Sequence, residues 1–185
     1  MPKIYTKRGD EGETKLLFGG TVSKSDPRTE AYGSTDAAVS AMGMARALCQ
    51  DGKVKNVLLR VQREMFTVGA ELATDPSNQE MFKKHFSETT AAMVSNLEKD
   101  IDEMLPQIKL PRAFIVPGAS AGSGALDLAR SLLRTGERRV VVLHEAGKLP
   151  NPKILRYLNR LSDLLFVLAR FEDRALPFEL TTGDP

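Results

Sequence analysis

The sequence contains one cysteine, no long apolar run and no excess of either charge. Cys49 alone cannot form an internal disulfide framework or a cysteine-based zinc site, and such low cysteine usage suits a reducing compartment. No segment approaches the roughly 18 consecutive apolar residues of a membrane span, which excludes an integral membrane protein. The N-terminal segment is polar and has neither the apolar core nor the cleavage site of a secretory signal. We therefore expect the protein in the cytoplasm.

Charge and length narrow the class of protein further. The chain has 26 Lys and Arg against 24 Asp and Glu, a net charge of +2. That balance does not fit a protein whose main affinity is for the phosphate backbone of a nucleic acid. The 185 residues, of which 42% are apolar, are enough for one domain with a substantial core. We expect a single domain over residues 1–185.

Behind a polar segment over residues 1–35, apolar residues recur three and four positions apart, the spacing of one buried helix face. The predicted helices cover residues 36–50, 54–73, 87–105, 124–145 and 152–172. Prolines break the stretch 106–123, so we predict a loop there, and we predict a loose tail over residues 174–185. No strand pattern of useful length is present. The predicted fold is all-α, an up-and-down five-helix bundle that is ferritin-like in outline.

Two polar features do not fit a plain bundle. On the fourth predicted helix, Arg130, Arg134 and Glu137 share one face. Gly136 beside them predicts a close packing contact, because a mid-helix glycine otherwise costs about 1 kcal/mol. On the last helix, Asn159 is a poor mid-helix residue unless its amide has a partner. A solvated stripe and an exposed amide are the plain structural alternatives.

The segment from Thr6 to Lys15 brings two glycines, two hydroxyls and three cations within ten residues. Glycines let backbone N–H groups turn inward as an anion nest, and hydroxyls with cations complete a cradle for a polyphosphate. The segment is not a P-loop, since the G-x-x-x-x-G-K-[ST] pattern is missing. From spacing alone, a polyphosphate site and an ordinary surface turn both remain open.

Other common chemistries are not indicated. His85 and His144 lack the Glu-x-x-His spacing of a di-iron bundle. Cys49 lies in an apolar helix with no base near it in sequence, so we predict a core residue. Neither a G-x-S-x-G nor a G-x-G-x-x-G motif is present.

Six segments occur in one order from Lys3 to about Arg170. They are KIYTKRGDEGETKL, EAYGSTD, QREMFTVGAELA, FIVPGAS, ALDLARSLLRTGERRVV and YLNRLSDLLFVLAR, with Lys24 and Arg28 between the first two. No single segment is decisive, but their order is specific. Together they resemble the ATP:cob(I)alamin adenosyltransferases of the propanediol-utilisation type.

The resemblance implies a homotrimer of five-helix bundles, with each active site between two subunits. It implies ATP, accompanied by Mg²⁺, and cob(I)alamin as substrates: cobalt(I) attacks the 5′ carbon of ATP and expels triphosphate, giving adenosylcobalamin. The corrinoid supplies the nucleophile, so the protein needs no Ser, Cys or His for that role. The implied partners are a cobalamin reductase or reduced flavoprotein and an adenosylcobalamin-dependent enzyme, with no nucleic acid and no membrane.

Carried over by position, the resemblance assigns three catalytic residues. Arg134 would stabilise the charge that builds on the leaving triphosphate, and Arg130 would pair across the subunit interface with Asp36. Phe114 and Phe166 would line the corrinoid side, where they would displace the lower axial ligand. The residues matched to ATP binding are Thr6, Lys7, Arg8, Gly9, Thr14, Lys15, Lys24, Arg134, Glu137, Arg138 and Asn159.

The chain departs from the family pattern at positions near this site. Val39 stands where the family usually has asparagine, Asp127 where it has histidine, and Gly136 where it has alanine. Changes on the corrinoid side leave a second hypothesis open, a trimer that binds ATP or adenosylcobalamin as a carrier or sensor without turnover. A helical nucleic-acid-binding module is a third, which the near-neutral charge disfavours.

Overall fold

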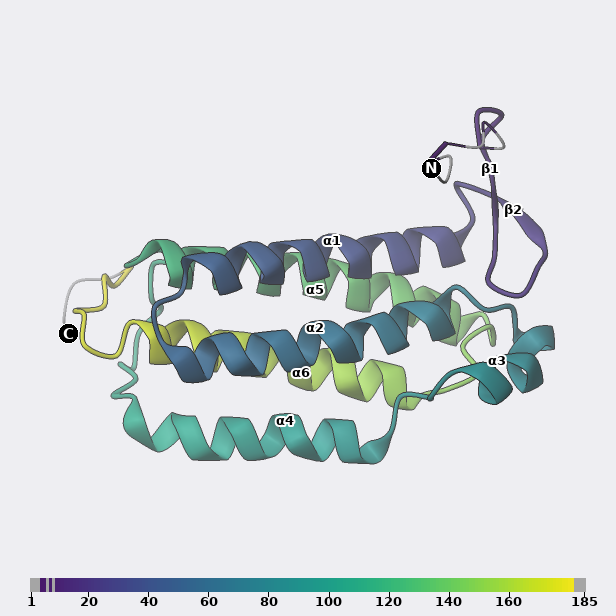
Figure 1. The fold of residues 1–185 in the computed structure, drawn as a ribbon. Coiled ribbons are helices and arrows are strands. Elements are labelled where there is room, and N and C mark those ends of the chain that lie inside the picture. The colour runs from purple at the N-terminus through teal and green to yellow at the C-terminus, as the bar shows by residue number, and fades with distance from the viewer. Residues whose placement is uncertain (1–3, 6, 8, 182–185) are drawn as a thin grey trace.

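Five long helices form an up-and-down bundle, and a small hairpin lies at one end of it (Figure 1). The computed structural model describes residues 4–5, 7 and 9–181. The all-α bundle predicted from the sequence is confirmed. The long helices are α1 (Pro27–Leu48), α2 (Gly52–Leu72), α4 (Ala91–Met104), α5 (Ala121–Glu145) and α6 (Lys153–Glu172), and the shorter ones are α3 (Gln79–His85) and 3₁₀ turns at Pro76–Asn78 and Leu105–Gln107.

Side-chain caps explain where three of the long helices begin. The carboxylate of Asp51 accepts hydrogen bonds from the backbone N–H groups of Lys53 and Val54 at the start of α2. Thr90 caps α4 and Ser120 caps α5 in the same way, through the backbone N–H of the third helical residue. Each cap satisfies N–H groups that the first helical turn leaves without a partner.

The first helix begins earlier than predicted. α1 starts at Pro27 rather than at residue 36, so nine residues of the expected N-terminal loop are helical. Asp26 caps this helix, and proline suits the first helical position because its N–H is not needed there. The run that follows Ala31 is Tyr-Gly-Ser-Thr, which has weak helix propensity, and packing against α5 overrides that preference.

A two-stranded antiparallel hairpin precedes α1, and it contradicts the expectation that the chain has no strand. β1 (Glu13–Lys15) pairs with β2 (Thr21–Ser23), and Thr14 lies opposite Val22. Strands of three residues are too short to show an alternating pattern in the sequence.

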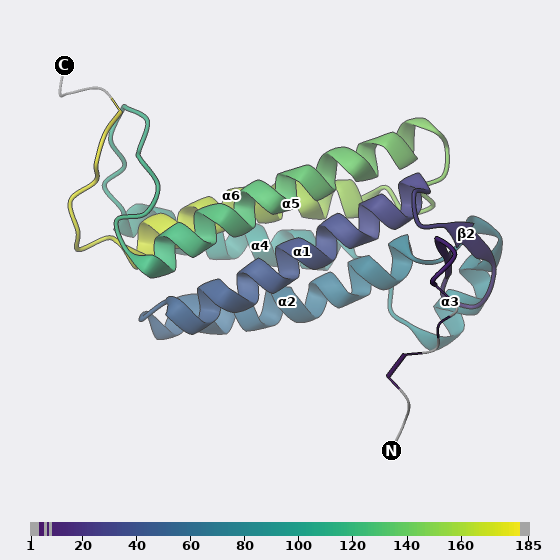
Figure 2. The same ribbon diagram turned by 90° about the horizontal axis from the view of Figure 1, so that it is seen from above.

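The segment after α6 is attached, rather than loose as predicted. Arg174 donates a hydrogen bond to the carboxylate of Asp51 at 2.8 Å. Further along, Leu180 pairs with Ile115 in an antiparallel bridge. The C-terminal segment therefore runs alongside the loop that precedes α5 (Figure 2).

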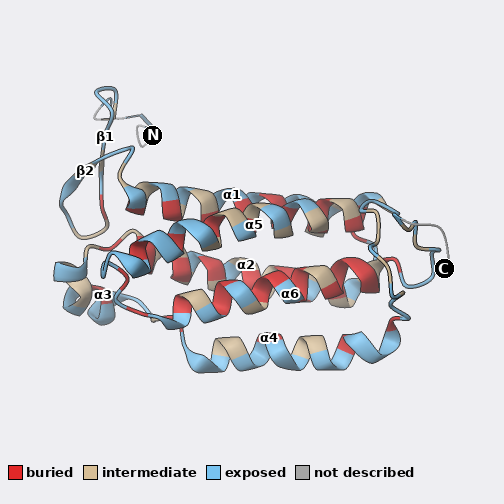
Figure 3. Ribbon diagram, turned by 180° about the vertical axis from the view of Figure 1, so that it is seen from behind, coloured by how far each residue is buried: buried red, intermediate tan, exposed pale blue. Residues whose placement is uncertain are grey.

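The core lies between α1, α2, α5 and α6, whose apolar faces meet along the bundle axis. α4 covers one edge, packs mainly against α6, and buries only Leu97 and Met104 fully (Figure 3). No helix within the described residues combines the length and the apolarity that crossing a membrane would need.

α1 and α5 pack closely as an antiparallel pair, and glycines on α5 allow the approach (Figure 2). A Cβ added at Gly136 would lie 3.3 Å from Cγ2 of Thr35, which confirms the contact predicted for this glycine. A Cβ added at Gly122 would lie 3.0 Å from Cα of Cys49. Cys49 is fully buried, as predicted, and its burial is the largest of the causes that raise the pKa of its thiol to about 12.

Replacing Gly122 with alanine is expected to destabilise the fold. The added Cβ would force α1 and α5 apart at Cys49, and overpacking of this kind lowers the free energy of unfolding by about 1–3 kcal/mol. Gly124→Ala is the matched control, because its Cβ would meet its nearest neighbour, Cα of Gly118, at 3.4 Å. Urea denaturation measures both variants. A Gly122→Ala protein as stable as the parent would contradict the close packing.

Candidate functional site

One lysine organises the glycine-rich turn before β1. Nζ of Lys24, directly after β2, donates a hydrogen bond to the carbonyl oxygen of Gly9 at 2.7 Å. The backbone N–H of Lys24 donates to the carbonyl oxygen of Gly12 at 2.8 Å. A Cβ on Gly9 would lie 3.1 Å from Nζ, so glycine leaves room for this approach. The hairpin thus brings a lysine from beyond its second strand to the segment considered as a polyphosphate cradle.

The remaining cradle residues lie around this turn. Lys7 has a φ of 62°, in the left-handed region that costs a non-glycine residue conformational energy and is enriched at functional sites. Thr14 and Lys15 lie on β1, where Thr14 is half-buried and Lys15 is exposed. Thr6 and Arg8, also assigned to ATP from the sequence, lie outside the described residues.

The hairpin is attached to the bundle at the end of α2. The backbone N–H of Leu17 donates to the carbonyl oxygen of Ala73 at 2.9 Å, and Leu16 beside it is buried. Phe18 stacks on the ring of His85 at the end of α3, with centroids 5.7 Å apart. The short helix α3, which the sequence did not indicate, therefore supports the base of the hairpin.

Arg28, buried at the start of α1, joins three segments below the hairpin. Its guanidinium donates to the carbonyl oxygens of Leu72 at 3.0 Å, Thr74 at 2.9 Å and Lys148 at 3.0 Å. Leu72 is the last residue of α2, Thr74 follows it by two positions, and Lys148 lies in the turn between α5 and α6. The Arg28 side chain thereby supplies hydrogen bonds to three carbonyl groups that have no acceptor role in a regular helix, because they lie at or beyond helix ends.

A buried carboxylate on α2 completes this end of the bundle. Glu71 is fully buried and accepts hydrogen bonds from the backbone N–H of Thr89 at 2.7 Å, from the Thr89 hydroxyl, and from Nδ2 of Asn151 at 2.8 Å. Asn151 also donates to the carbonyl oxygen of Thr89 at 3.0 Å. Arg28, Glu71, Thr89 and Asn151 are called the polar junction below.

On α5, the predicted polar face lies on the half of the helix nearer the hairpin (Figure 1). Arg134 and Arg138 are exposed, and among the described residues no carboxylate pairs with Arg134. Glu137 accepts a hydrogen bond from Nδ2 of Asn159 on α6 at 3.1 Å. Asn159 therefore has the amide partner that its mid-helix position predicted, and this bond joins α5 to α6 beside the two arginines.

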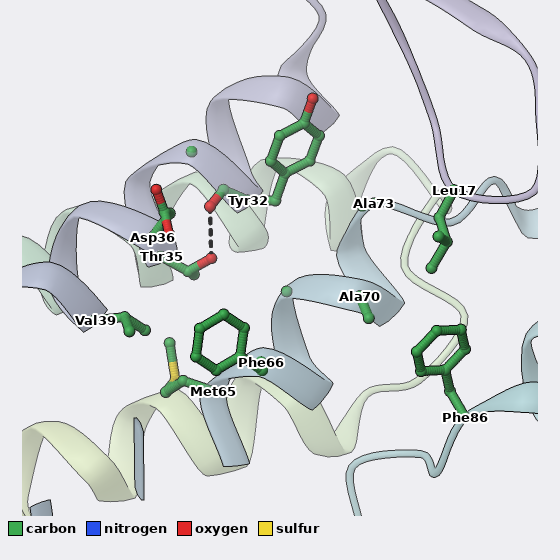
Figure 4. Close-up of a pocket in the computed structure, with 12 residues that line it drawn as sticks. Leu17, Tyr32, Thr35, Asp36, Val39, Met65, Phe66, Ala70, Ala73 and Phe86 are labelled. Carbon is green, nitrogen blue, oxygen red and sulfur yellow. Dashed lines mark hydrogen bonds between the residues drawn. The ribbon is translucent and has the colours of Figure 1, made fainter. Parts of the chain in front are cut away.

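An apolar groove of about 540 Å³ opens between α1 and α2 beside the hairpin (Figure 4). Tyr32, Asp36 and Val39 line it from α1, and Phe66 lines it from α2. Phe86, after α3, closes the end near the hairpin. This cavity is called the α1–α2 groove. The sequence did not indicate Phe66 as a groove residue, because an apolar side chain in a helix normally packs in the core. In the structure this side chain is 69% exposed.

A second groove, of about 370 Å³, lies between α5, α6 and the loop 110–117. Phe114 on the loop is 84% exposed, and Phe166 on α6 lines the groove from below. The guanidinium carbons of Arg130 and Arg170 lie 5.7 and 5.5 Å from the centre of the Phe166 ring, within reach of a cation–π interaction. This cavity is called the α5–α6 groove.

Asp127, where the resemblance leads us to expect histidine, forms an ion pair with Arg170 in this groove. The two side chains are 13% and 3% exposed. Burial raises the pKa of Asp127, although Arg170 and Arg130 act in the opposite direction. The substituted position thus has an internal partner, and the pair holds Arg170 beside the Phe166 ring.

Asp36 and Arg130 do not meet within one chain. Gly136 of α5 lies against Thr35 of the antiparallel α1, so Arg130 lies level with Ala41. At 1.5 Å per residue, Asp36 is then about 7.5 Å away along the helix axis. Asp36 lines the α1–α2 groove and Arg130 lines the α5–α6 groove. Within one chain, the two residues therefore belong to different grooves.

Comparison with known proteins identifies the family. The family model for cobalamin adenosyltransferase matches residues 4–172, and a corrinoid adenosyltransferase of Citrobacter freundii is 35% identical over 173 residues, 94% of this chain and 96% of that protein. The chain belongs to the cobalamin adenosyltransferase family. MMAB of Bos taurus is 39% identical over 174 residues, 92% of this chain and 71% of that protein. PduO of Salmonella typhimurium is 36% identical over 170 residues, and the chain spans about half of its length (92% of this chain, 49% of that protein).

Solved structures of PduO-type enzymes share this cobalamin adenosyltransferase fold. A variant ATP:corrinoid adenosyltransferase from Lactobacillus reuteri, complexed with cobalamin and ATP, has a TM-score of 0.87 at 32% identity, covering 98% of this chain and 100% of that chain. Another variant, complexed with ATP, has a TM-score of 0.85 at 31% identity, covering 97% and 100%. The resemblance drawn from the ordered sequence segments is confirmed.

Asp127→Asn in this cobalamin adenosyltransferase is expected to destabilise the fold. The variant would leave Arg170 charged and buried, and breaking a buried ion pair from one side lowers the free energy of unfolding by about 3–5 kcal/mol. The double replacement Asp127→Leu with Arg170→Met should recover most of the loss, since no unpaired charge remains. Urea denaturation of the three proteins measures this, and a fully stable Asp127→Asn protein would show that the pair contributes nothing.

Proposed function

We propose that this chain transfers the 5′-deoxyadenosyl group of ATP to the cobalt of cob(I)alamin, giving adenosylcobalamin and triphosphate. A cobalt–carbon bond forms at the 5′ carbon of ATP, the bond from that carbon to oxygen breaks, and triphosphate leaves with the electron pair. The family match over residues 4–172 carries the proposal. The geometry of the described residues supports the roles proposed for them below.

The cationic turn binds the triphosphate of ATP. Lys7, Lys15 and Lys24 supply positive charge, and the contact between Lys24 and Gly9 holds the turn in place before ATP arrives. Thr6, Arg8 and Thr14 contribute by their match to the family. Preformed donors of this kind bind a polyphosphate without a large ordering cost on binding.

The arginine face of α5 stabilises the leaving group. Arg134 and Arg138 are exposed, and Arg138 donates one hydrogen bond to the hydroxyl of Thr135 at 3.0 Å, so both guanidinium groups keep donors that can meet phosphate oxygens. Negative charge increases on the triphosphate as the carbon–oxygen bond breaks, and a guanidinium placed there lowers the barrier. The hydrogen bond between Glu137 and Asn159 keeps Glu137 turned toward α6 and away from Arg134.

The two grooves form the corrinoid site across an interface. Phe114 and Phe166 present an apolar surface that displaces the lower axial ligand of the corrinoid, which makes cobalt(II) easier to reduce. Because Asp36 lines one groove and Arg130 the other, an ion pair between these residues in two copies sets the grooves against each other.

This arrangement supports a homotrimer. A contact between the α1–α2 groove of one copy and the α5–α6 groove of another is heterologous, because it joins two different surfaces. In a closed ring, every copy can use both of its grooves in such a contact. Large apolar side chains lie exposed on α1, α2 and α5, and contact with another copy would bury them: Met44 (56%), Phe66 (69%), Leu128 (50%) and Val142 (47%).

ATP enters as its Mg²⁺ complex. Among the described residues, no three His, Cys, Asp or Glu side chains are grouped to hold a metal ion, so the phosphates hold Mg²⁺ rather than a protein cage. A cobalamin reductase or reduced flavoprotein supplies cobalt(I), and an adenosylcobalamin-dependent enzyme takes the product. The reducing cytoplasm suits both cobalt(I) and the free thiol of Cys49.

A second candidate function is a trimer that binds ATP or adenosylcobalamin as a carrier or sensor. The observation in its favour is that both departures near the corrinoid lie on groove walls, Val39 in the α1–α2 groove and Asp127 in the α5–α6 groove. Measuring whether the protein converts cob(I)alamin and ATP to adenosylcobalamin distinguishes the enzyme from the carrier or sensor.

Arg134→Ala is expected to reduce adenosylation by about 10²–10³-fold, the effect of removing one preorganised group that stabilises developing charge. The assay mixes chemically reduced cob(I)alamin with protein, Mg²⁺ and ATP, and follows the loss of the cobalt(I) absorbance band. Arg139→Ala is the matched control, because Arg139 is an exposed arginine of the same helix that faces Glu30 at 3.9 Å. It should retain activity.

The outcomes separate the hypotheses. Unchanged turnover in Arg134→Ala, with normal oligomeric state by light scattering, would overturn the assignment of the α5 face. No turnover in the parent protein, with ATP still bound, would favour the carrier function.

Co-expression of Asp36→Ala and Arg130→Ala chains is expected to restore activity that each variant alone lacks. In a mixed trimer, one of the three interfaces joins an intact Asp36 to an intact Arg130, so the isolated mixed trimers should regain about a third of the sites. Two affinity tags isolate the mixed trimers for the same assay. A site built within one chain would give no restoration.

A further inference from the structure

The C-terminal segment runs antiparallel to the loop that carries Phe114 (Figure 2). The backbone N–H of Val116 donates to the carbonyl oxygen of Glu179 at 2.7 Å. The backbone N–H of Thr181 donates to the carbonyl oxygen of Phe114 at 3.0 Å. These two bonds flank the bridged pair Ile115 and Leu180, and Phe114 lies at one edge of this short ladder, which joins segments more than sixty positions apart in the sequence.

Among the residues that the structure describes, the loop 109–119 has no other hydrogen-bonded support. Residues 109–119 are all described, and their hydrogen bonds to described residues go to the C-terminal segment alone. Pro111 and Pro117 remove two donors from the loop. A loop without internal hydrogen bonds depends on its partner for a defined conformation.

The C-terminal segment is itself attached at the end of α6. The guanidinium of Arg174 donates to Asp51 at 2.8 Å and lies 4.0 Å from the centre of the Phe171 ring. Phe178, partly buried, packs against the core between this attachment and the ladder. The segment therefore joins the loop to the rigid part of the bundle.

Phe114 is not held by packing of its own ring, which is 84% exposed. Its position over the α5–α6 groove depends on the backbone of residues 114–116, and that backbone depends on the ladder. We propose that residues 175–181 form a strap that positions Phe114 toward the corrinoid. The inference rests on the proposed function, in which Phe114 faces that substrate. Thr181 is a positioning residue, since it acts through Phe114.

Thr181→Pro tests the strap, because proline lacks the N–H that donates to Phe114. We expect kcat/KM for cob(I)alamin to fall about tenfold, the scale of one ordered hydrogen bond, while KM for ATP stays within twofold. Thr181→Ala keeps the N–H and should stay within twofold of the parent for both substrates. Equal effects of the two substitutions would overturn the proposal.

A double-mutant cycle separates positioning from general damage. If the strap acts through Phe114, Thr181→Pro should have no further effect on kcat/KM in a Phe114→Ala background. Additive losses would show that the strap affects the site by another route and would overturn the proposal.

Hydrogen exchange measured on peptides from residues 109–119 tests the strap without turnover. Thr181→Pro should raise exchange at Val116, and Thr181→Ala should not. Unchanged exchange in Thr181→Pro overturns the strap, whatever the activity. An inactive parent protein that shows the expected exchange would instead overturn the proposed function and leave the strap's hold on the loop supported.

Discussion

Burial of one guanidinium at the start of α1 fixes the end of the bundle to which the hairpin is attached. Arg28 donates to carbonyl oxygens at the end of α2 and before α6, and Glu71 is held by Thr89 and Asn151. Buried charges are tolerated when hydrogen bonds replace the lost hydration, and every contact of this junction links segments that are distant in sequence. The hairpin attaches at Ala73, directly beside these contacts, so the cationic turn takes its position from the junction.

The site is divided along the bundle, and α5 connects its parts. Arg134 and Arg138 lie on the half of α5 near the hairpin, and Arg130 lies in the α5–α6 groove nearer its other end. Asp36, on the neighbouring helix, opens into the other groove. One chain therefore presents the two grooves separately, and the ring proposed above would join them.

Close packing of α1 against α5 fixes how far apart the two grooves lie along the bundle. Gly136 brings α5 against Thr35, which sets the register of the arginine face relative to Asp36. The acid at Asp127 is compensated inside the chain, because Arg170 pairs with it and both side chains are largely buried beside Phe166. An acid on this groove wall therefore leaves no buried charge unpaired.

The sequence by itself determined the long helices, the residue composition of the cationic turn, the close contact at Gly136 and the need of Asn159 for a partner. These features depend on residues within a few positions of one another, so periodicity, capping and composition encode them. Tertiary structure alone decided the helical start at Pro27, the hairpin, α3, the ion pair of Asp127 and the pairing of the C-terminal segment with residues 114–116. Each of these depends on contacts between distant segments, which can stabilise conformations that local propensity does not favour.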